Sequence, residues 1–187
     1  DALPIYFRVE VLSFTRLSHI VLSAYGGIKK DVASGAARLI YMSLAVESLG
    51  DRLRVFGRHK NDISLSSKLL SFVDEMKNEG ITADELEKSA ADIADRLLRE
   101  KTEEAALIYR TYEAVVAQSA FDDADLLSRV YDILCGEDFF AGKTVVIDGF
   151  PSFTYDELRL ISLMMRQAED VYVTLCLDKI DITAQTG

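Results

Sequence analysis

The spacing of apolar residues changes along this chain, and the change restricts the folds that it can adopt. Between residues 64 and 134 apolar residues recur every three or four positions, which is typical of amphipathic helices. After residue 140, two short runs rich in β-branched residues, 144–147 and 171–175, flank another helical pattern. Strands joined through a helix run parallel in a buried sheet. The sequence therefore predicts a predominantly helical α/β fold with a parallel strand–helix–strand unit.

Composition places the chain among globular proteins. Its 187 residues are 49% hydrophobic, with ten Gly and two Pro, which argues against disordered and collagen-like classes. No apolar run reaches the length of a membrane span, and no basic segment leads into an apolar one as in a signal peptide, so we expect a cytoplasmic protein without membrane contact. Cys135 and Cys176 lack partners at metal-ligand spacing, and His19 and His59 are forty residues apart, so the sequence predicts no metal site.

Capping residues and glycines set the expected limits of the elements. In the first part of the chain we expect a strand at 7–12, helices at about 13–26 and 31–50, and a loop at 51–61. Two capping boxes follow, each with Thr at the cap and Glu three residues later, at Thr82–Glu85 and Thr154–Glu157. The helix after the first box is expected to bury three residues, Leu86, Ile93 and Leu97.

A stripe of five residues at helical spacing contains two tyrosines: Ala105, Ile108, Tyr109, Tyr112 and Val116. Tyrosines of a nucleic-acid-binding protein sometimes stack on bases. Here the spacing matches one buried helix face, so we predict that the stripe belongs to the hydrophobic core.

The net charge of −10 is unevenly distributed. Residues 1–60 hold nine Lys and Arg against five Asp and Glu, residues 61–140 hold eight against nineteen, and residues 141–187 hold four against seven. An acidic middle repels a polyanion, so a nucleic-acid contact is expected in the first sixty residues. A solvated surface with no functional asymmetry is the alternative.

Two motifs resemble parts of a nucleotide site. Gly142-Lys143-Thr144 looks like the end of a phosphate-binding loop, but Glu137 stands where the first glycine is required, and a strand follows where a helix is needed. We therefore predict a turn into a strand. Asp148 ends an apolar strand, as does the Mg²⁺-binding acid of P-loop enzymes, but Gly149 occupies the position of the water-activating Glu in helicases. We interpret this pair as a degenerate Walker B motif, with no catalytic residue in the chain.

Five stretches occur together in a fixed order: VLSFTRLSH at 11–19, FDDADLL at 121–127, VIDGF at 146–150, FTYDEL at 153–158 and VYVTL at 171–175. In this combination the chain resembles the AddB subunit of bacterial AddAB helicase-nucleases over nearly its whole length. VIDGF with its flanking Phe-Thr and Glu-Leu is the most specific part. AddB subunits are similar to UvrD-type superfamily-one helicases, in which related stretches occur in the same order.

The resemblance implies a division into three parts. Residues 1–30 would begin a helicase-like α/β core, residues 31–140 would form an inserted all-helical subdomain, and residues 141–187 would return to the core with the degenerate Walker B. The chain starts at Asp1 without an initiator Met and stops soon after an apolar strand, so we expect a fragment of a longer protein.

The same resemblance implies the surroundings of the fragment. A P-loop would lie before Asp1, and a nuclease domain with the cysteines of a 4Fe-4S cluster would lie after Gly187. ATP, Mg²⁺ and the cluster would then be cofactors of the parent, with none held by this fragment. The parent would act with an AddA-type motor subunit on DNA double-strand breaks during recombinational repair, and its helicase-like part would track single-stranded DNA or recognise Chi-type sequences.

Candidate DNA contacts come from two arguments. The stretch at 13–19 matches a helicase segment near the single strand, so the resemblance implies Thr15, Arg16 and His19 as contacts, with Arg16 suited to a phosphate. Charge alone adds three arginines and three lysines: Arg52, Arg54, Arg58, Lys29, Lys30 and Lys60. The alternative for the first set is a capped helix start without a binding role.

Two other functions remain open at this point. An active UvrD-type helicase fragment is disfavoured by Gly149. A protein-interaction module with acidic helices belongs to a different class, and an exposed apolar patch on the helical insertion would favour it, whereas a basic groove from the first sixty residues would favour DNA.

Overall fold

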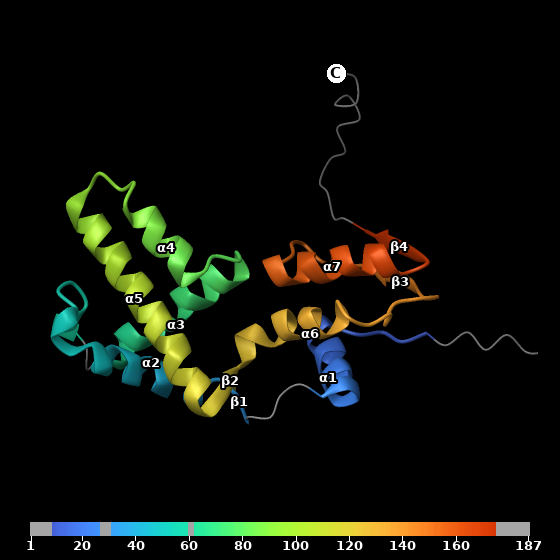
Figure 1. Cartoon of the computed structure of the whole chain (residues 1–187), viewed down its shortest axis with the longest axis horizontal. Coiled ribbons are helices and arrows are strands. Elements are labelled where there is room, and N and C mark those ends of the chain that lie inside the picture. The colour runs from blue at the N-terminus through green and yellow to red at the C-terminus, as the bar shows by residue number, and fades with distance from the viewer. Residues whose placement is uncertain (1–8, 27–30, 60–61, 175–187) are drawn as a thin grey trace, which may run out of the picture.

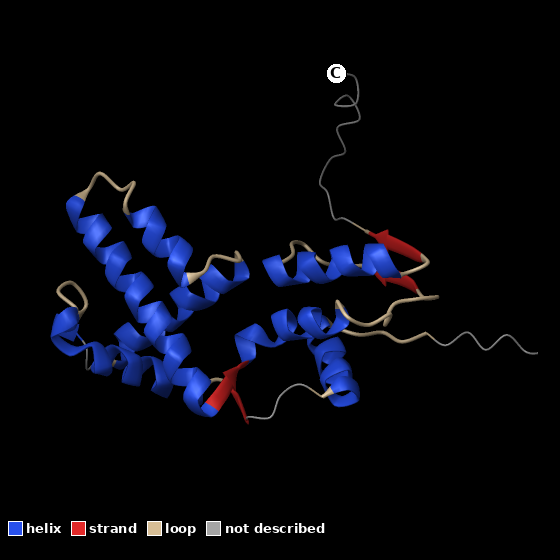
Figure 2. Ribbon diagram, viewed as in Figure 1, coloured by secondary structure: helices blue, strands red, loops and turns tan. Residues whose placement is uncertain are grey.

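The computed structural model describes residues 9–26, 31–59 and 62–174 and arranges them in two lobes (Figures 1 and 2). Helices dominate both lobes, and the strands are short. In chain order the elements are α1 (Phe14–Tyr25), β1 (Asp31–Ala33), α2 (Ala36–Leu49), the 3-10 turns η1 (Gly50–Arg52) and η2 (Gly57–His59), α3 (Ile63–Asn78), α4 (Ala83–Ala90), α5 (Arg96–Ser119), β2 (Ala120–Asp122), η3 (Asp123–Asp125), α6 (Leu126–Leu134), β3 (Thr144–Ile147), α7 (Tyr155–Gln167) and β4 (Asp170–Val173).

The helical lobe consists of α2 to α5 around one hydrophobic cluster. α4 and α2 both pack along α5, and α3 packs on α2. Ile108, Tyr109 and Tyr112 of α5 are buried in this cluster, which confirms the prediction that the tyrosine stripe is core. The amphipathic spacing of α5 thus supplies the centre of the lobe.

The second lobe holds the strand–helix–strand unit. β3 and β4 pair in parallel, from Thr144 opposite Asp170 to Ile147 opposite Val173, and α7 connects them, so the predicted unit is confirmed. α6 packs against both α1 and α7, and their apolar faces form a second hydrophobic cluster. Both predicted capping boxes are present, at the starts of α4 and α7.

Residues 9–12 do not form the strand that their alternating pattern predicted. Val9 and Val11 are largely exposed, and no strand among the described residues pairs with this segment. An alternating pattern yields a strand only where a partner and a covering layer are available. The part of the expected strand before residue 9 lies outside the described residues.

A second parallel pair was not expected from the sequence. Asp31–Ala33, predicted as the start of a helix, is strand β1, and it pairs with β2 from Asp31 opposite Ala120 to Ala33 opposite Asp122. Three-residue strands carry too little periodicity to be recognised locally. Figure 1 shows this pair where the chain passes between the two lobes.

Two further differences concern the helical region. Leu97 is 64% exposed, not buried, because α4 ends at Ala90 and Asp95 caps a new helix by accepting a hydrogen bond from the Leu98 N–H at 2.7 Å. α6 belongs to the hydrophobic cluster of the second lobe, whereas the sequence division placed residues up to 140 in the helical insertion.

Gly80 brings the two lobes into contact. It follows α3 with φ +72°, and a Schellman pattern closes the helix: Gly80 N–H donates to the Lys77 carbonyl at 3.0 Å, and Ile81 N–H donates to the Met76 carbonyl at 2.8 Å. A Cβ at Gly80 would lie 2.5 Å from Cγ of Tyr155 at the start of α7. The aromatic ring of one lobe therefore rests directly on backbone of the other.

Candidate functional site

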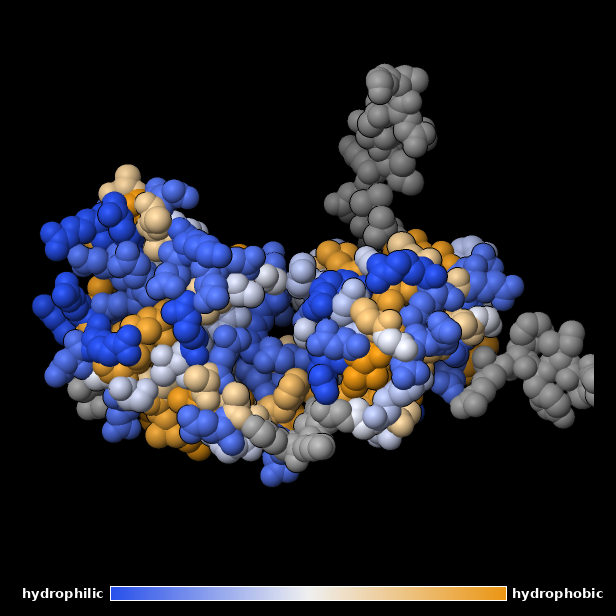
Figure 3. All heavy atoms as spheres, in the orientation of Figure 1, coloured by the Kyte–Doolittle hydropathy of each residue, from blue (hydrophilic) through white to orange (hydrophobic). Residues whose placement is uncertain are grey.

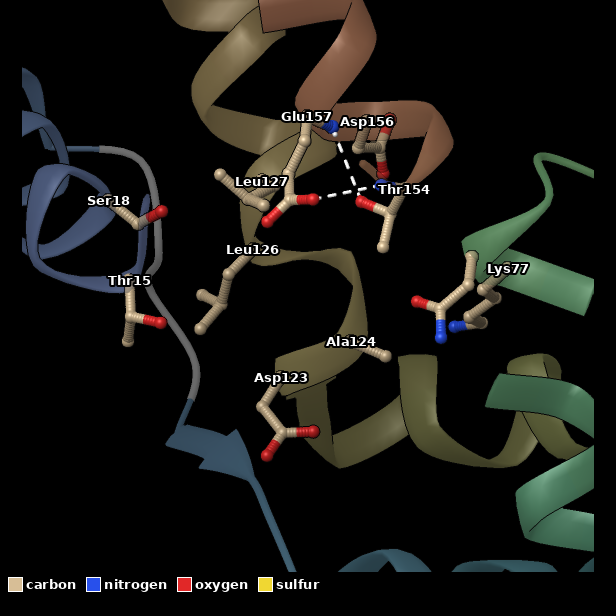
Figure 4. Close-up of a pocket in the computed structure, with 11 residues that line it drawn as sticks. Thr15, Ser18, Lys77, Asp123, Ala124, Leu126, Leu127, Thr154, Asp156 and Glu157 are labelled. Atoms are coloured by element: carbon tan, nitrogen blue, oxygen red, sulfur yellow. Dashed lines mark hydrogen bonds between the residues drawn. The ribbon is translucent and has the colours of Figure 1, made fainter. Parts of the chain in front are cut away.

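A pocket of about 350 Å³ opens at the junction of the lobes (Figure 4). α1, the end of α3, η3, the start of α6 and the start of α7 supply its walls. The lining residues are Thr15, Ser18, Lys77, Asn78, Asp123, Ala124, Leu126, Leu127, Thr154, Asp156 and Glu157. Two of the stretches that carry the family resemblance, 11–19 and 121–127, therefore meet here.

A buried ionic network stands beside the pocket, with Asp122 at its centre. Asp122 is 4% exposed, and its carboxylate pairs with Arg38 Nε at 2.7 Å and with Lys77 Nζ at 3.1 Å. The Tyr112 hydroxyl donates to the same carboxylate at 2.9 Å, and the Ala124 N–H donates at 3.1 Å. The network ties strand β2 to helices α2, α3 and α5.

Outer acids complete this network. Asp74 pairs with the Arg38 guanidinium, and Asp125 accepts from Lys77 Nζ at 2.7 Å. Burial alone would raise the pKa of Asp122, but Lys77 and Arg38 together hold it below its ordinary value. Burial likewise acts to lower the pKa of Lys77, yet Asp125 and Asp122 raise it above its ordinary value. The buried groups are therefore ionised, and they stabilise one another.

The charge of the pocket disfavours a phosphate ligand. Asp123, Asp156 and Glu157 contribute three carboxylates, and Lys77 is already paired. At the start of α7 the Thr154 hydroxyl accepts from the Glu157 N–H, and the Glu157 carboxylate accepts from the Thr154 N–H at 2.8 Å (Figure 4). The helix start that would otherwise attract an anion is capped by the chain itself.

α1 presents the three residues that the resemblance singled out. Thr15, Arg16 and His19 are exposed within its first two turns, whereas Leu17 and Val21 are buried against the second lobe. The Ser13 side chain caps the helix by accepting from the Arg16 N–H at 3.2 Å, as the sequence indicated. Thr15 lines the pocket, so the structure brings one of the three to it.

Arg52, Arg54 and Arg58 lie elsewhere. They are exposed on the segment that contains η1 and η2, at the end of the helical lobe remote from α1 (Figure 1). The structure therefore separates the candidate DNA contacts into two surfaces. Lys29, Lys30 and Lys60 lie outside the described residues.

Asp148 and Gly149 follow β3, as predicted for a degenerate Walker B, but neither lines the pocket. The Asp148 carboxylate accepts a hydrogen bond from the Thr174 hydroxyl after β4. Gly149 has φ +81°, a backbone conformation that disfavours any residue with a side chain. The absence of Glu at this position thus fits the local backbone.

Sequence reasoning did not identify most of the network. Arg38 and Lys77 appeared only as charges on helices, and Asp74 was not considered. Arg38 stands in an otherwise apolar stretch of α2, and that isolated charge is the one local signal that could have marked a buried ion pair. Among the described residues, no group of three or more His, Cys, Asp and Glu side chains is placed to hold a metal ion.

These features define a class of protein: a helical subdomain joined to a parallel strand–helix–strand unit, with a degenerate Walker B after the first strand of that unit. The family described as ADDB, N-terminal, matches residues 2–186. The chain therefore belongs to the AddB N-terminal family.

Curated relatives agree with this assignment. Proteins named as an ATP-dependent helicase/deoxyribonuclease subunit are similar: 32% identical over 90% of the chain in Listeria innocua, 30% over 94% in Clostridioides difficile and 32% over 91% in Ruminiclostridium cellulolyticum. The chain spans only 14% to 15% of the length of these relatives. No helix in the described part of the chain is long and apolar enough to cross a membrane.

Proposed function

We propose that this chain is a helicase-like, non-catalytic part of a helicase-nuclease subunit that processes double-strand DNA breaks, and that it guides single-stranded DNA. The names of the relatives, a helicase and deoxyribonuclease subunit, support this role. The parent would work in the cytoplasm with an AddA-type motor subunit, and ATP, Mg²⁺ and a 4Fe-4S cluster would be cofactors of that larger assembly. Chi-type recognition belongs to the same proposal.

The observation that carries the proposal is the surface of α1. Among the α-helices of the described residues, α1 alone contains no Asp or Glu. Arg16 and His19 are one turn apart and exposed, and no described residue forms an ion pair with Arg16. A guanidinium that no described residue occupies is available to a phosphate, and the Thr15 hydroxyl next to it can donate a further hydrogen bond. In an acidic protein this makes α1 the best placed helix for a DNA backbone.

Three features support a non-catalytic role in nucleotide hydrolysis. The sequence contains no phosphate-binding loop. The Asp148 carboxylate bonds to Thr174, and the backbone at Gly149 disfavours the glutamate that activates water in helicases. We expect calorimetry to detect no Mg²⁺-dependent ATP binding by the chain, and tight binding would contradict this part of the proposal.

The DNA contact is tested by fluorescence anisotropy with labelled single-stranded DNA at low salt. Arg16→Ala should weaken binding several-fold, because each lost phosphate contact removes a counterion-release contribution. Arg166→Ala makes the same charge change on exposed α7 and serves as the matched control. Equal affinities of the two variants would show that α1 does not contact DNA.

One observation favours a protein partner as well. Ile40 and Leu44, one turn apart on α2, are 59% and 47% exposed and belong to the helical lobe, over which Figure 3 shows areas of apolar surface. We propose that this face contacts a protein surface of the assembly, for which the AddA-type subunit is the candidate. Ile40→Lys should abolish co-elution of that subunit with the parent protein, whereas Ile63→Lys, at an exposed residue of α3, should not.

A further inference from the structure

The segment that carries Arg52, Arg54 and Arg58 is held in place by one carboxylate from α5. Glu104 is 8% exposed, and its Oε1 accepts from the backbone N–H groups of Arg54 at 2.6 Å and Val55 at 2.9 Å. Its Oε2 accepts from Val55 and Phe56, both at 3.0 Å. Three consecutive amides thus converge on one side chain.

This arrangement uses the loop backbone as an anion site for a group of the protein itself. Consecutive N–H groups form a concave nest that favours a carboxylate or phosphate. Burial of a carboxylate is costly unless hydrogen bonds replace its water, and these four bonds do so. Buried Leu53 and partly buried Phe56 anchor the same segment to the core of the helical lobe. The backbone between Leu53 and Phe56 is therefore fixed from both sides.

The side chains that remain outside are basic. Arg52, Arg54 and Arg58 are exposed, and none of them forms an ion pair or a side-chain hydrogen bond with another described residue. Other arginines of the chain behave differently, since Arg38 and Arg159 pair with acids. Between residues 50 and 59 the single acid is Asp51. A fixed backbone thus displays, within seven residues of an acidic protein, three guanidinium groups that no described acid neutralises.

We propose that this segment is a preorganised docking surface for the phosphodiester backbone of DNA, and that Glu104 is its positioning residue. The inference rests on the proposed function and adds a second contact, remote from α1. Guanidinium groups bind phosphate oxygens through paired hydrogen bonds. A loop already held in its binding conformation loses little conformational entropy when it binds. The Glu104 charge is buried beneath the loop and neutralised by amides, so it does not occupy the arginines.

The test measures the affinity of the 187-residue chain for labelled single-stranded DNA over a tenfold range of KCl. The logarithm of affinity falls with the logarithm of salt by roughly 0.7 for each phosphate contact. We expect the combined Arg52→Ala, Arg54→Ala and Arg58→Ala variant to reduce this slope by about 2. Glu104→Gln should reduce the slope in the same direction, and addition of the three arginine changes to it should have little further effect. An unchanged slope in the arginine variant overturns the proposal.

Glu103→Gln is the matched control for the positioning role. Glu103 is the exposed neighbour of Glu104, and its replacement removes the same charge without touching the loop. Loss of a negative charge should slightly strengthen DNA binding in that control. Glu104→Gln should weaken binding instead and should expose the amides of Arg54, Val55 and Phe56 to hydrogen exchange. If both glutamate variants strengthen binding, Glu104 is not a positioning residue.

Two further arms separate the possible explanations. Loss of binding in Arg16→Ala together with an unchanged slope in the triple arginine variant would leave the proposed function standing and overturn this inference. Poly-glutamate that competes as well as DNA at equal charge would also overturn it, because the loop would then bind acidic protein segments in general. The arginine variants change exposed residues only, so we expect the fold to remain intact in the arm that decides the outcome.

Discussion

Replacement of Gly80 by Ala tests how the two lobes are joined. Gly80 closes α3 at φ +72°, and a Cβ there would lie 2.5 Å from Cγ and 2.7 Å from both Cδ atoms of the Tyr155 ring. No Cβ approaches an aromatic ring so closely, so the ring or the α3 terminus must move. The variant therefore combines backbone strain with a steric conflict between the lobes.

The two contributions have different sizes. A left-handed conformation costs a residue with a side chain about 1 kcal/mol. Displacement of a packed ring costs about 1 to 3 kcal/mol more. Gly142→Ala isolates the first contribution, because Gly142 has φ +66° but nothing within 4 Å of its Cβ position. We therefore expect a loss of about 1 kcal/mol in Gly142→Ala and about 2 to 4 kcal/mol in Gly80→Ala.

Urea denaturation followed by circular dichroism measures both variants. The double variant Gly80→Ala with Tyr155→Ala removes the steric conflict, so the coupling free energy between the two changes should favour the double variant by more than about 0.5 kcal/mol, the threshold for residues in contact. Equal losses in Gly80→Ala and Gly142→Ala would refute the reasoning, because the Tyr155 ring would then offer no resistance to a Cβ. Additive effects of the two changes at Gly80 and Tyr155 would refute it as well.

Three other predictions follow from the network, the caps and the strand end. Asp122→Asn should cost about 3 kcal/mol at neutral pH, because Arg38 and Lys77 lose their shared counterion. Since folding lowers the pKa of Asp122, that stabilisation is present above its ordinary value of 3.8 and is lost as the pH falls further, so urea titrations should show the gap to wild type closing below that pH. Thr154→Ala should lower stability by about 1 kcal/mol in the same assay, and no change would contradict the capping role. Gly149→Glu should leave ATP hydrolysis at background in a coupled assay while lowering the thermal midpoint, and measurable hydrolysis would contradict the non-catalytic assignment.

Local patterns in the sequence were sufficient for several elements. Thr82 with Glu85 and Thr154 with Glu157 marked two helix starts, because a capping box satisfies backbone donors only a few residues away. The β-branched runs after residue 140 indicated the parallel pair, since strands flanking a helix are buried on the face that the helix covers. Such signals depend on neighbours in the chain, so the sequence contains them in full.

The site depended on contacts between distant segments. Asp122 gains its role because α2 and α3 bring Arg38 and Lys77 to it. The resemblance marked the stretch around Asp122 but not its partners, and nothing local distinguished Lys77 from the other lysines. Pairing of β1 with β2 was equally invisible, because each strand is three residues long and the register is set by the packing of the helical lobe.

Neighbouring residues of identical chemistry show where the sequence stops being decisive. Glu103 and Glu104 are adjacent acids on α5, and the sequence determined that both lie on a helix whose apolar stripe faces a core. Only the tertiary structure decided that Glu103 remains in solvent while Glu104 is buried beneath the backbone of Arg54, Val55 and Phe56. A rotation of about 100° per residue turns the two side chains to different surroundings. Which surroundings they meet is fixed by a loop some fifty residues away, whose approach no local pattern encodes.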